Sequence, residues 1–223
     1  MIDESLVRVN IFSSKIKELS VTKRIVLDYP IYVRETVARK LANVAQKLPS
    51  HLQLQIDSGF RDTKTEKVLW KVRLNATKRS HPELSTEEVY ELTSSLVQNP
   101  AVSNSSHSTG GAVDVSLLNA AGDEINLSEP FANYYDEPKL TSSKISKSAQ
   151  ELRFLLNNLM LSEGFAPNDR EYWHFSYGSQ TWADYYGTNT VYQTIDLGRE
   201  KYFSLFYRFW LRVYVRLLKL VKK

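Results

Sequence analysis

The sequence predicts an α+β fold in which helices flank a small antiparallel sheet. Stretches with apolar residues at every third or fourth position, typical of amphipathic helices, are interspersed with stretches in which apolar and polar residues alternate, typical of half-buried strands. The chain has 223 residues, of which 42% are hydrophobic and 24% charged, and this composition excludes a disordered protein. The length predicts one compact domain with an appendage.

The first half of the chain is predicted to form a helix, a strand and two further helices. In order, these elements are residues 30–48, 52–57, 63–77 and 86–98. Pro30 opens the first helix, and the strand ends in a Ser-Gly-Phe-Arg turn that finishes at Arg61. The last helix begins at Ser85, with Glu88 three residues later in a capping-box pattern, and Pro100 stops it.

The second half is predicted to form a strand, a long helix and an aromatic strand. The strand at 112–118 follows a segment rich in Ser, Asn and Gly, and the helix at 142–161 ends before Gly164. The aromatic strand covers residues 172–177 and is closed by Gly178. Strands and helices therefore alternate irregularly around one small sheet.

A change in charge separates a domain at residues 1–197 from a tail at 198–223. The tail has a net charge of +7 and the rest of the chain a net charge of −3, so the overall charge of +4 comes from the tail. A body with this charge does not favour a nucleic-acid partner. Cations recur in the tail at helical steps, which predicts a basic, aromatic, amphipathic helix.

This tail has two open interpretations. Its cations disfavour a membrane span, but a helix lying on an anionic lipid surface would suit them. The alternative is a helix that packs on the body or on a second subunit. The N-terminus lacks the features of a cleaved signal peptide, so we expect a cytoplasmic protein, which would lie peripherally at the inner face of the membrane if the tail binds lipid.

The residues available for chemistry are few. The chain has no cysteine, so it has no disulfide and no thiolate nucleophile, and any metal site must use His, Asp and Glu. His107 and Asp114 are separated by a segment with two glycines that lets a loop and a strand converge. With His174 they would give zinc three ligands and leave the fourth position to water, which is typical of a catalytic site.

Glu171 is a candidate general base beside this site. Alternation along a strand puts residues 171 and 174 on opposite faces, so Glu171 reaches the site only if it lies in an irregular entry to the strand. The residues alone leave other interpretations open: His107 as a solvated loop residue, His174 as a core or rim residue, and Arg61 as a surface cation.

Three segments resemble motifs of the zinc D-alanyl-D-alanine peptidases. Residues 105–114 are similar to the motif S-x-H-x-x-G-x-A-x-D, residues 171–175 to E-x-W-H-[FY], and residues 57–61 to the strand end that supplies an arginine. Their order and approximate spacing also match, over about residues 30–187. Within this family, the chain is most similar to the branch of dipeptidases that includes the vancomycin-resistance enzyme.

The resemblance implies a role for each matched residue. His107, Asp114 and His174 would bind one Zn2+ per chain, and Glu171 would act as general base and then acid in hydrolysis by metal-activated water. Arg61 would stabilise the oxyanion and contact the substrate, and Ser105 would donate to the substrate carboxylate. The implied partner is a small peptide that ends in D-Ala.

Two departures from the family pattern concern the substrate. Ala132 stands where the dipeptidases have an Asp that pairs with the free amino group of the dipeptide, and Glu129, Asp136 or Glu137 are the candidate replacements. Asp62 stands where the family usually has Pro. The resemblance therefore predicts hydrolysis of D-alanyl-D-alanine, with two alternatives: a D,D-carboxypeptidase that trims D-Ala from peptidoglycan stem peptides, and a binding module with a structural zinc.

Overall fold

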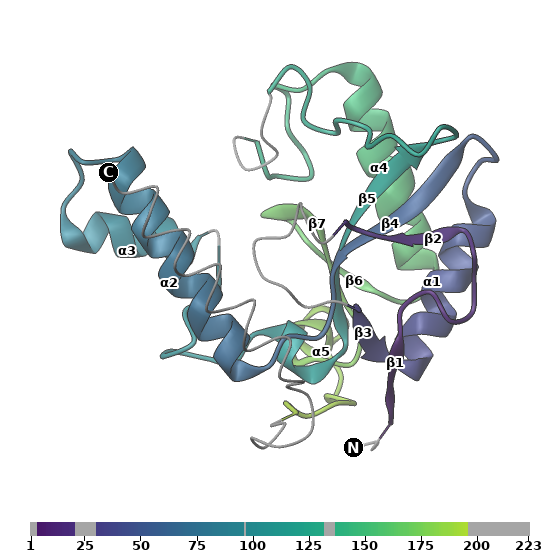
Figure 1. Ribbon diagram of the computed structural model, residues 1–223, viewed down its shortest axis with the longest axis horizontal. Coiled ribbons are helices and arrows are strands. Elements are labelled where there is room, and N and C mark those ends of the chain that lie inside the picture. Colours follow the sequence, from purple (N-terminus) through teal and green to yellow (C-terminus); the bar gives the residue numbers. More distant parts are fainter. Residues whose placement is uncertain (1–3, 21–29, 96, 132–136, 196–223) are drawn as a thin grey trace.

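The computed structural model describes residues 4–20, 30–95, 97–131 and 137–195, and its centre is a five-stranded sheet (Figure 1). The strand order is β2 (Ile16–Glu18), β4 (Leu52–Ser58), β5 (Ala112–Asn119), β7 (Glu171–Ser176) and β6 (Ala166–Asn168). Three of the four neighbouring pairs are antiparallel, and β2 runs parallel to β4. The predicted α+β class is confirmed, with one parallel pairing at an edge.

A second, two-stranded sheet corrects one predicted boundary. Strand β1 (Leu6–Arg8) pairs antiparallel with β3 (Tyr32–Arg34), so residues 32–34 are not helical. Helix α1 (Glu35–Lys47) begins directly after them, five residues later than predicted. The pairing with β1 was not visible in the sequence because three-residue strands are too short to show a period.

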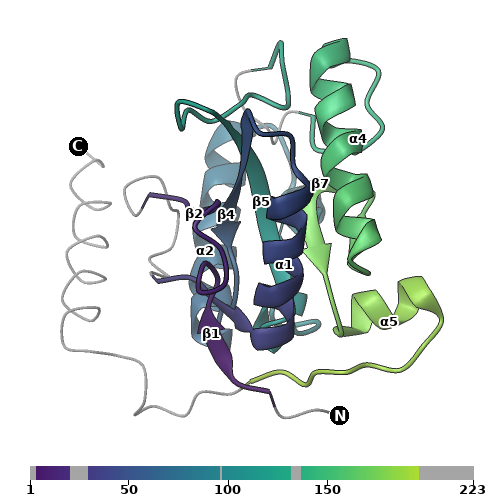
Figure 2. The same ribbon diagram turned by 90° about the vertical axis from the view of Figure 1, so that its right-hand side faces the viewer.

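Helices α1 and α4 (Lys147–Ser162) cover one face of the five-stranded sheet, as Figure 2 shows. The core lies between the sheet and these helices and includes fully buried residues from both layers: Val37, Leu41, Val44, Leu54, Ile56, Val113, Val115, Leu156, Met160 and Phe175. Because side chains alternate along a strand, the residues between these positions point to the other face. That face is polar, and it bears Asp57, Asp114 and His174.

Helices α2 (Thr63–Ser80) and α3 (Thr86–Ser94) project from one end of the sheet in Figure 1. The predicted capping box at α3 is present, because Ser85 Oγ accepts from Glu88 N and Ser85 N donates to the Glu88 carboxylate. The helix ends four residues before the predicted boundary. A 3-10 helix, η2 (Ser106–Thr109), precedes β5, and helix α5 (Gln180–Tyr186) packs against β6.

The basic tail at 198–223 lies outside the described residues, so its helix and the domain boundary before it stay predictions. None of the helices among the described residues has the length and hydropathy of a transmembrane span.

A buried arginine ties the segment after β5 to helix α4. Arg153 is 1% exposed and donates to the backbone oxygens of Leu127, Glu137 and Lys139 at 2.7, 2.9 and 2.6 Å. Its guanidinium carbon also lies 3.7 Å from the centre of the Tyr172 ring. The cation thus supplies donors to three backbone oxygens, and its hydrogen bonds to Leu127 and Glu137 are buried.

We expect Arg153→Met to lower the free energy of unfolding by roughly 3 kcal/mol or more, because the acceptors of three buried hydrogen bonds, on Leu127, Ser128 and Glu137, lose their donor at once. Denaturant titration measures this. Lys147→Met, at an exposed position of the same helix, is the control and should change stability by no more than about 0.5 kcal/mol. A loss below about 1 kcal/mol for Arg153→Met would show that the carbonyls find other donors.

Candidate metal centre

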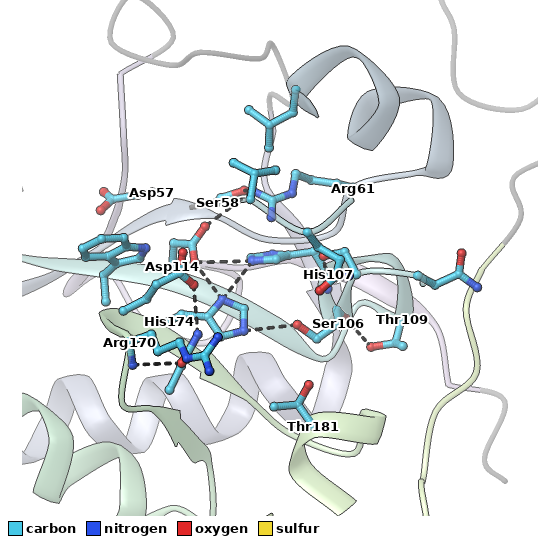
Figure 3. Close-up of a pocket in the computed structure, with 18 of the residues that line it drawn as sticks. Asp57, Ser58, Arg61, Ser106, His107, Thr109, Asp114, Arg170, His174 and Thr181 are labelled. Carbon is cyan, nitrogen blue, oxygen red and sulfur yellow. Dashed lines mark hydrogen bonds and ion pairs between the residues drawn. The ribbon is translucent and has the colours of Figure 1, made fainter. Parts of the chain in front are cut away.

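Three potential ligand atoms converge on the polar face of the sheet (Figure 3). His107 Nε2 lies 3.2 Å from His174 Nδ1 and 3.3 Å from Asp114 Oδ1, and His174 Nδ1 lies 3.0 Å from the same carboxylate oxygen. Asp114 and His174 are direct partners across β5 and β7, while His107 comes from η2. The predicted ligand set is therefore brought together by two strands and one turn.

The spacing of these atoms fits a tetrahedral metal ion. At metal–ligand distances of about 2.0–2.1 Å, two ligands of a tetrahedron lie about 3.3 Å apart. All three sides of the observed triangle are within 0.3 Å of that separation. Two imidazoles and one carboxylate are also a donor set that zinc accepts. The group can thus hold a metal ion with three ligands.

Partners behind the imidazoles fix which nitrogen faces the ligand triangle. His107 Nδ1 lies 2.8 Å from the carbonyl oxygen of Gly59, an acceptor only, so the ring proton sits on Nδ1 and Nε2 presents its lone pair. His174 Nε2 lies 3.1 Å from Ser106 Oγ, which leaves Nδ1 for the triangle. Such outer partners orient metal ligands and tune their affinity.

Two glycines allow the turn that delivers His107. Gly110 ends η2 with a φ of +75°, a left-handed conformation that glycine adopts without strain. A Cβ on Gly111 would clash with the Tyr177 carbonyl oxygen, so this position also requires glycine. The backbone hydrogen bond from Tyr177 N to Gly111 O, at 2.8 Å, joins the start of β5 to the end of β7.

The electrostatics of the centre favour an anionic Asp114 between two rings. Burial acts to raise the pKa of Asp114, but His107, His174 and Arg61 outweigh it and hold this pKa well below its usual range. Burial and the Arg61 charge lower the pKa of His107. Burial opposes protonation of His174 too, yet its contacts with Asp114 raise its pKa.

Arg61 reaches the centre from the turn after β4. Its Nη1 lies 3.5 Å from Asp114 Oδ2 and 3.1 Å from Ser58 Oγ, and its Nε donates to Glu66 Oε1 at 2.9 Å. Glu66 is 3% exposed and belongs to the first turn of α2. Sequence reasoning missed this residue, because nothing in a helical glutamate five residues after an arginine distinguishes it from a surface ion pair.

Glu171 enters the same cavity through an irregularity in the sheet. The β6–β7 register shifts between Pro167 and Asn168, so Asn168 lies opposite Glu171. Asn168 Nδ2 donates to Glu171 Oε2 at 3.0 Å. Burial raises the pKa of Glu171. Its carboxylate is not one of the three converging ligands, which leaves it available for proton transfer.

The six residues singled out from the sequence line one cavity of about 830 Å3: Arg61, Ser105, His107, Asp114, Glu171 and His174. The Ser105 oxygen accepts from His107 N at 3.3 Å and caps η2, while its hydroxyl hydrogen can still donate to another group. Glu129 and Glu137 do not line this cavity, and Asp136 and Ala132 lie outside the described residues.

Most of the chain matches one family of known proteins. Residues 15–192 match the model of a family described as D-ala-D-ala dipeptidase. The D-alanyl-D-alanine dipeptidase of Synechocystis sp. is 33% identical over 43% of this chain and 43% of its own length. That of Escherichia coli is 26% identical over 63% of this chain and 62% of its own. The chain thus spans less than two thirds of either relative.

Among solved structures, the chain is similar to one described as VanYB in complex with D-Alanine-D-Alanine. It is 16% identical, with a TM-score of 0.46, and the match covers 74% of this chain and 83% of that one.

Removal of one ligand should abolish tight metal binding. Loss of an outer partner of a ligand weakens metal binding about 10- to 100-fold. We expect His174→Ala, which removes a ligand itself, to weaken zinc binding by more than this. Ser106→Ala should fall within that range, because it removes only the partner of His174 Nε2. Competition with a chromophoric chelator measures both affinities. His81→Ala, which alters a histidine outside the cavity, should bind zinc like the unaltered chain; equal affinities in all four proteins would exclude this centre.

Proposed function

The chain belongs to the D-alanyl-D-alanine dipeptidase family, and on this basis we propose that it hydrolyses free D-alanyl-D-alanine with Zn2+ held by His107, Asp114 and His174. The observation that carries the proposal is the triangle of three donor atoms, none more than 3.3 Å apart, in one cavity with the non-ligating carboxylate of Glu171. A structural zinc would need no such carboxylate, so this pairing favours an enzyme over a binding module.

When bound, zinc would lower the pKa of a coordinated water to about 7 and polarise a carbonyl oxygen. Glu171 Oε1 or Oε2 takes a proton from the attacking water as the new C–O bond forms, and it gives this proton to the leaving amine when the C–N bond breaks afterwards. The raised pKa of Glu171 suits this exchange, because a buried carboxylate is a stronger base than an exposed one.

Arg61 stabilises the negative charge that develops on the carbonyl oxygen. Its guanidinium is already aimed at the centre, and the ion pair with Glu66 holds it there at 2.9 Å. A fixed cation that meets charge only in the transition state lowers the barrier without tightening substrate binding equally. Ser105, at the cavity wall, donates to the terminal carboxylate of the substrate.

A D,D-carboxypeptidase that trims stem peptides is the second candidate. The cavity volume of about 830 Å3 favours it, since this is near the upper end of the range for drug-sized ligands and far exceeds what a dipeptide fills. A cytoplasmic location would favour the free dipeptide as substrate instead.

Contact of the tail at 198–223 with a membrane or with a second subunit stays a prediction.

The choice of substrate can be measured directly. We expect the zinc-loaded protein to cleave D-alanyl-D-alanine with a higher kcat/KM than it cleaves a stem pentapeptide ending in D-Ala-D-Ala. Release of D-alanine is the readout for both. A preference for the pentapeptide would replace the dipeptidase by the carboxypeptidase, and inactivity on both would reject a D,D-peptidase.

Glu171→Gln should lower kcat about 100- to 10,000-fold, because the amide cannot accept the proton of the attacking water. Zinc content should stay at that of the unaltered chain, since Glu171 is not a ligand. Asp169→Asn removes a carboxylate from the turn just before Glu171 and serves as the matched control. Turnover by Glu171→Gln at the rate of the unaltered enzyme would contradict the assigned role.

Arg61→Lys should lower kcat/KM by about 100-fold or more, because an ammonium cannot keep both the Glu66 pair and the contact with the developing oxyanion. Steady-state kinetics measures the effect, and Arg79→Lys, at an exposed position of α2, should have none. If both variants retain full activity, the oxyanion must be stabilised by other groups.

A further inference from the structure

The cavity contains more acidic residues than hydrolysis requires. Four acidic side chains of the described residues line it: Asp57, Asp114, Glu124 and Glu171. Asp114 belongs to the ligand triangle and Glu171 transfers the proton. Asp57 and Glu124 therefore have no part in the chemistry derived above.

Asp57 is held rigidly on the cavity wall. It lies where the β4–β5 register shifts, between Ile56 and Ser58, and it follows the core residue Ile56, so its side chain points to the polar face of the sheet. Its Oδ1 accepts from Gln55 Nε2 at 2.9 Å and from Ser116 Oγ at 3.0 Å. Both donors are neutral, and among the described residues no basic side chain forms an ion pair with this carboxyl.

The surroundings of Asp57 favour a cation. Burial raises the pKa of this carboxyl to about 8, and the charges of Glu124 and Asp114 act in the same direction. A positive group placed against Asp57 would offset the cost of burying its charge. Glu124, by contrast, is exposed at the rim.

Asp57 directly precedes Ser58, the residue opposite Asp114 across β4 and β5. Its hydrogen-bond partner Ser116 is two residues along β5 from Asp114, which corresponds to about 7 Å. In D-alanyl-D-alanine the amino nitrogen is two bonds, or roughly 2.5 Å, from the scissile carbonyl carbon. A hydrogen bond of about 2.9 Å to a carboxylate extends this reach to about 5.4 Å, which is of the same order as the spacing along β5. In Figure 3 Asp57 lies on the far side of Asp114 from His107.

We propose that Asp57 binds the α-ammonium group of the free dipeptide, and so gives the site its demand for an unblocked amine. This inference rests on the proposed function. Asp57 supplies a carboxylate on the cavity wall. Neither Glu129 nor Glu137 does so, since neither lines the cavity and Glu137 pairs with Lys144 at 3.5 Å. The interaction is an ionic hydrogen bond that acylation of the substrate amine removes.

The test removes the charge from each partner in turn. Binding of D-alanyl-D-alanine and of propionyl-D-alanine, which lacks only the amino group, is measured by calorimetry on the zinc-loaded full chain. Glu171→Gln is the background, so that the peptides are not consumed. In this background Asp57→Asn should weaken binding of D-alanyl-D-alanine about 10- to 100-fold. Binding of propionyl-D-alanine should change by less than about 3-fold, because it has no partner for the carboxylate.

Asp123→Asn is the matched control, since it removes the same charge from an exposed turn outside the cavity. It should leave both affinities unchanged. An equal loss for the two peptides in Asp57→Asn, or no loss for either, overturns the role of Asp57. If Asp57→Asn does not fold, the unaltered site must still bind D-alanyl-D-alanine at least about 10-fold more tightly than propionyl-D-alanine, and equal affinities overturn the inference.

The outcomes separate this inference from the proposed function. Suppose that the unaltered enzyme cleaves D-alanyl-D-alanine but that Asp57→Asn does not change its affinity for the dipeptide. This result rejects only the inference. Binding that depends on Asp57 without any cleavage rejects only the dipeptidase. Failure to bind either peptide rejects both.

Discussion

The register between β5 and β7 is the constraint on which the site depends. It sets Asp114 opposite His174, so their side chains leave the sheet on the same face and meet at 3.0 Å. A slip of one residue would turn one of them into the apolar core, because strand side chains alternate. The backbone bond between Gly111 and Tyr177 at the end of the ladder helps to hold this register. The rest of the fold positions other groups around this pair.

One face of the sheet contributes to the stability of the fold, and the other face carries the functional groups. One face packs Ile56, Val115 and Phe175 against α1 and α4, and it fixes the strands rigidly. The other bears carboxyl, imidazole and hydroxyl groups whose partners are almost all neighbouring strand or turn residues. Arg61 is held by Glu66 from α2, and Glu171 by Asn168 from β6. Functional groups supported in this way keep the geometry that catalysis requires.

The sequence predicts secondary structure where a periodic pattern is long, and it predicts site residues where several of them lie close together in one motif. The alternation at 52–57 and 112–118 predicted β4 and β5, and the spacing of Ser85 and Glu88 predicted the cap of α3. The resemblance of residues 105–114 and 171–175 to peptidase motifs selected the ligand triangle and Glu171. These features are local, so they can be read without knowledge of the fold.

Other features depend on contacts between distant parts of the chain and could not be predicted. Strands β1, β2 and β6 have three residues each, and tertiary pairing alone defines them. The ion pair of Glu66 with Arg61 and the support of Asp57 by Ser116 connect residues on different elements or different strands. The entry of Glu171 into the cavity requires the register shift beside Pro167, which a strict alternation rule forbids.

X-ray absorption at the zinc edge tests the central claim most directly, since it reports the atoms around the metal without reference to turnover. The structure predicts four-coordinate zinc with two imidazole nitrogens and oxygen donors at about 2.0–2.1 Å. A spectrum without imidazole scattering, or a six-coordinate shell of oxygens alone, would contradict the assignment of His107, Asp114 and His174 as the metal centre.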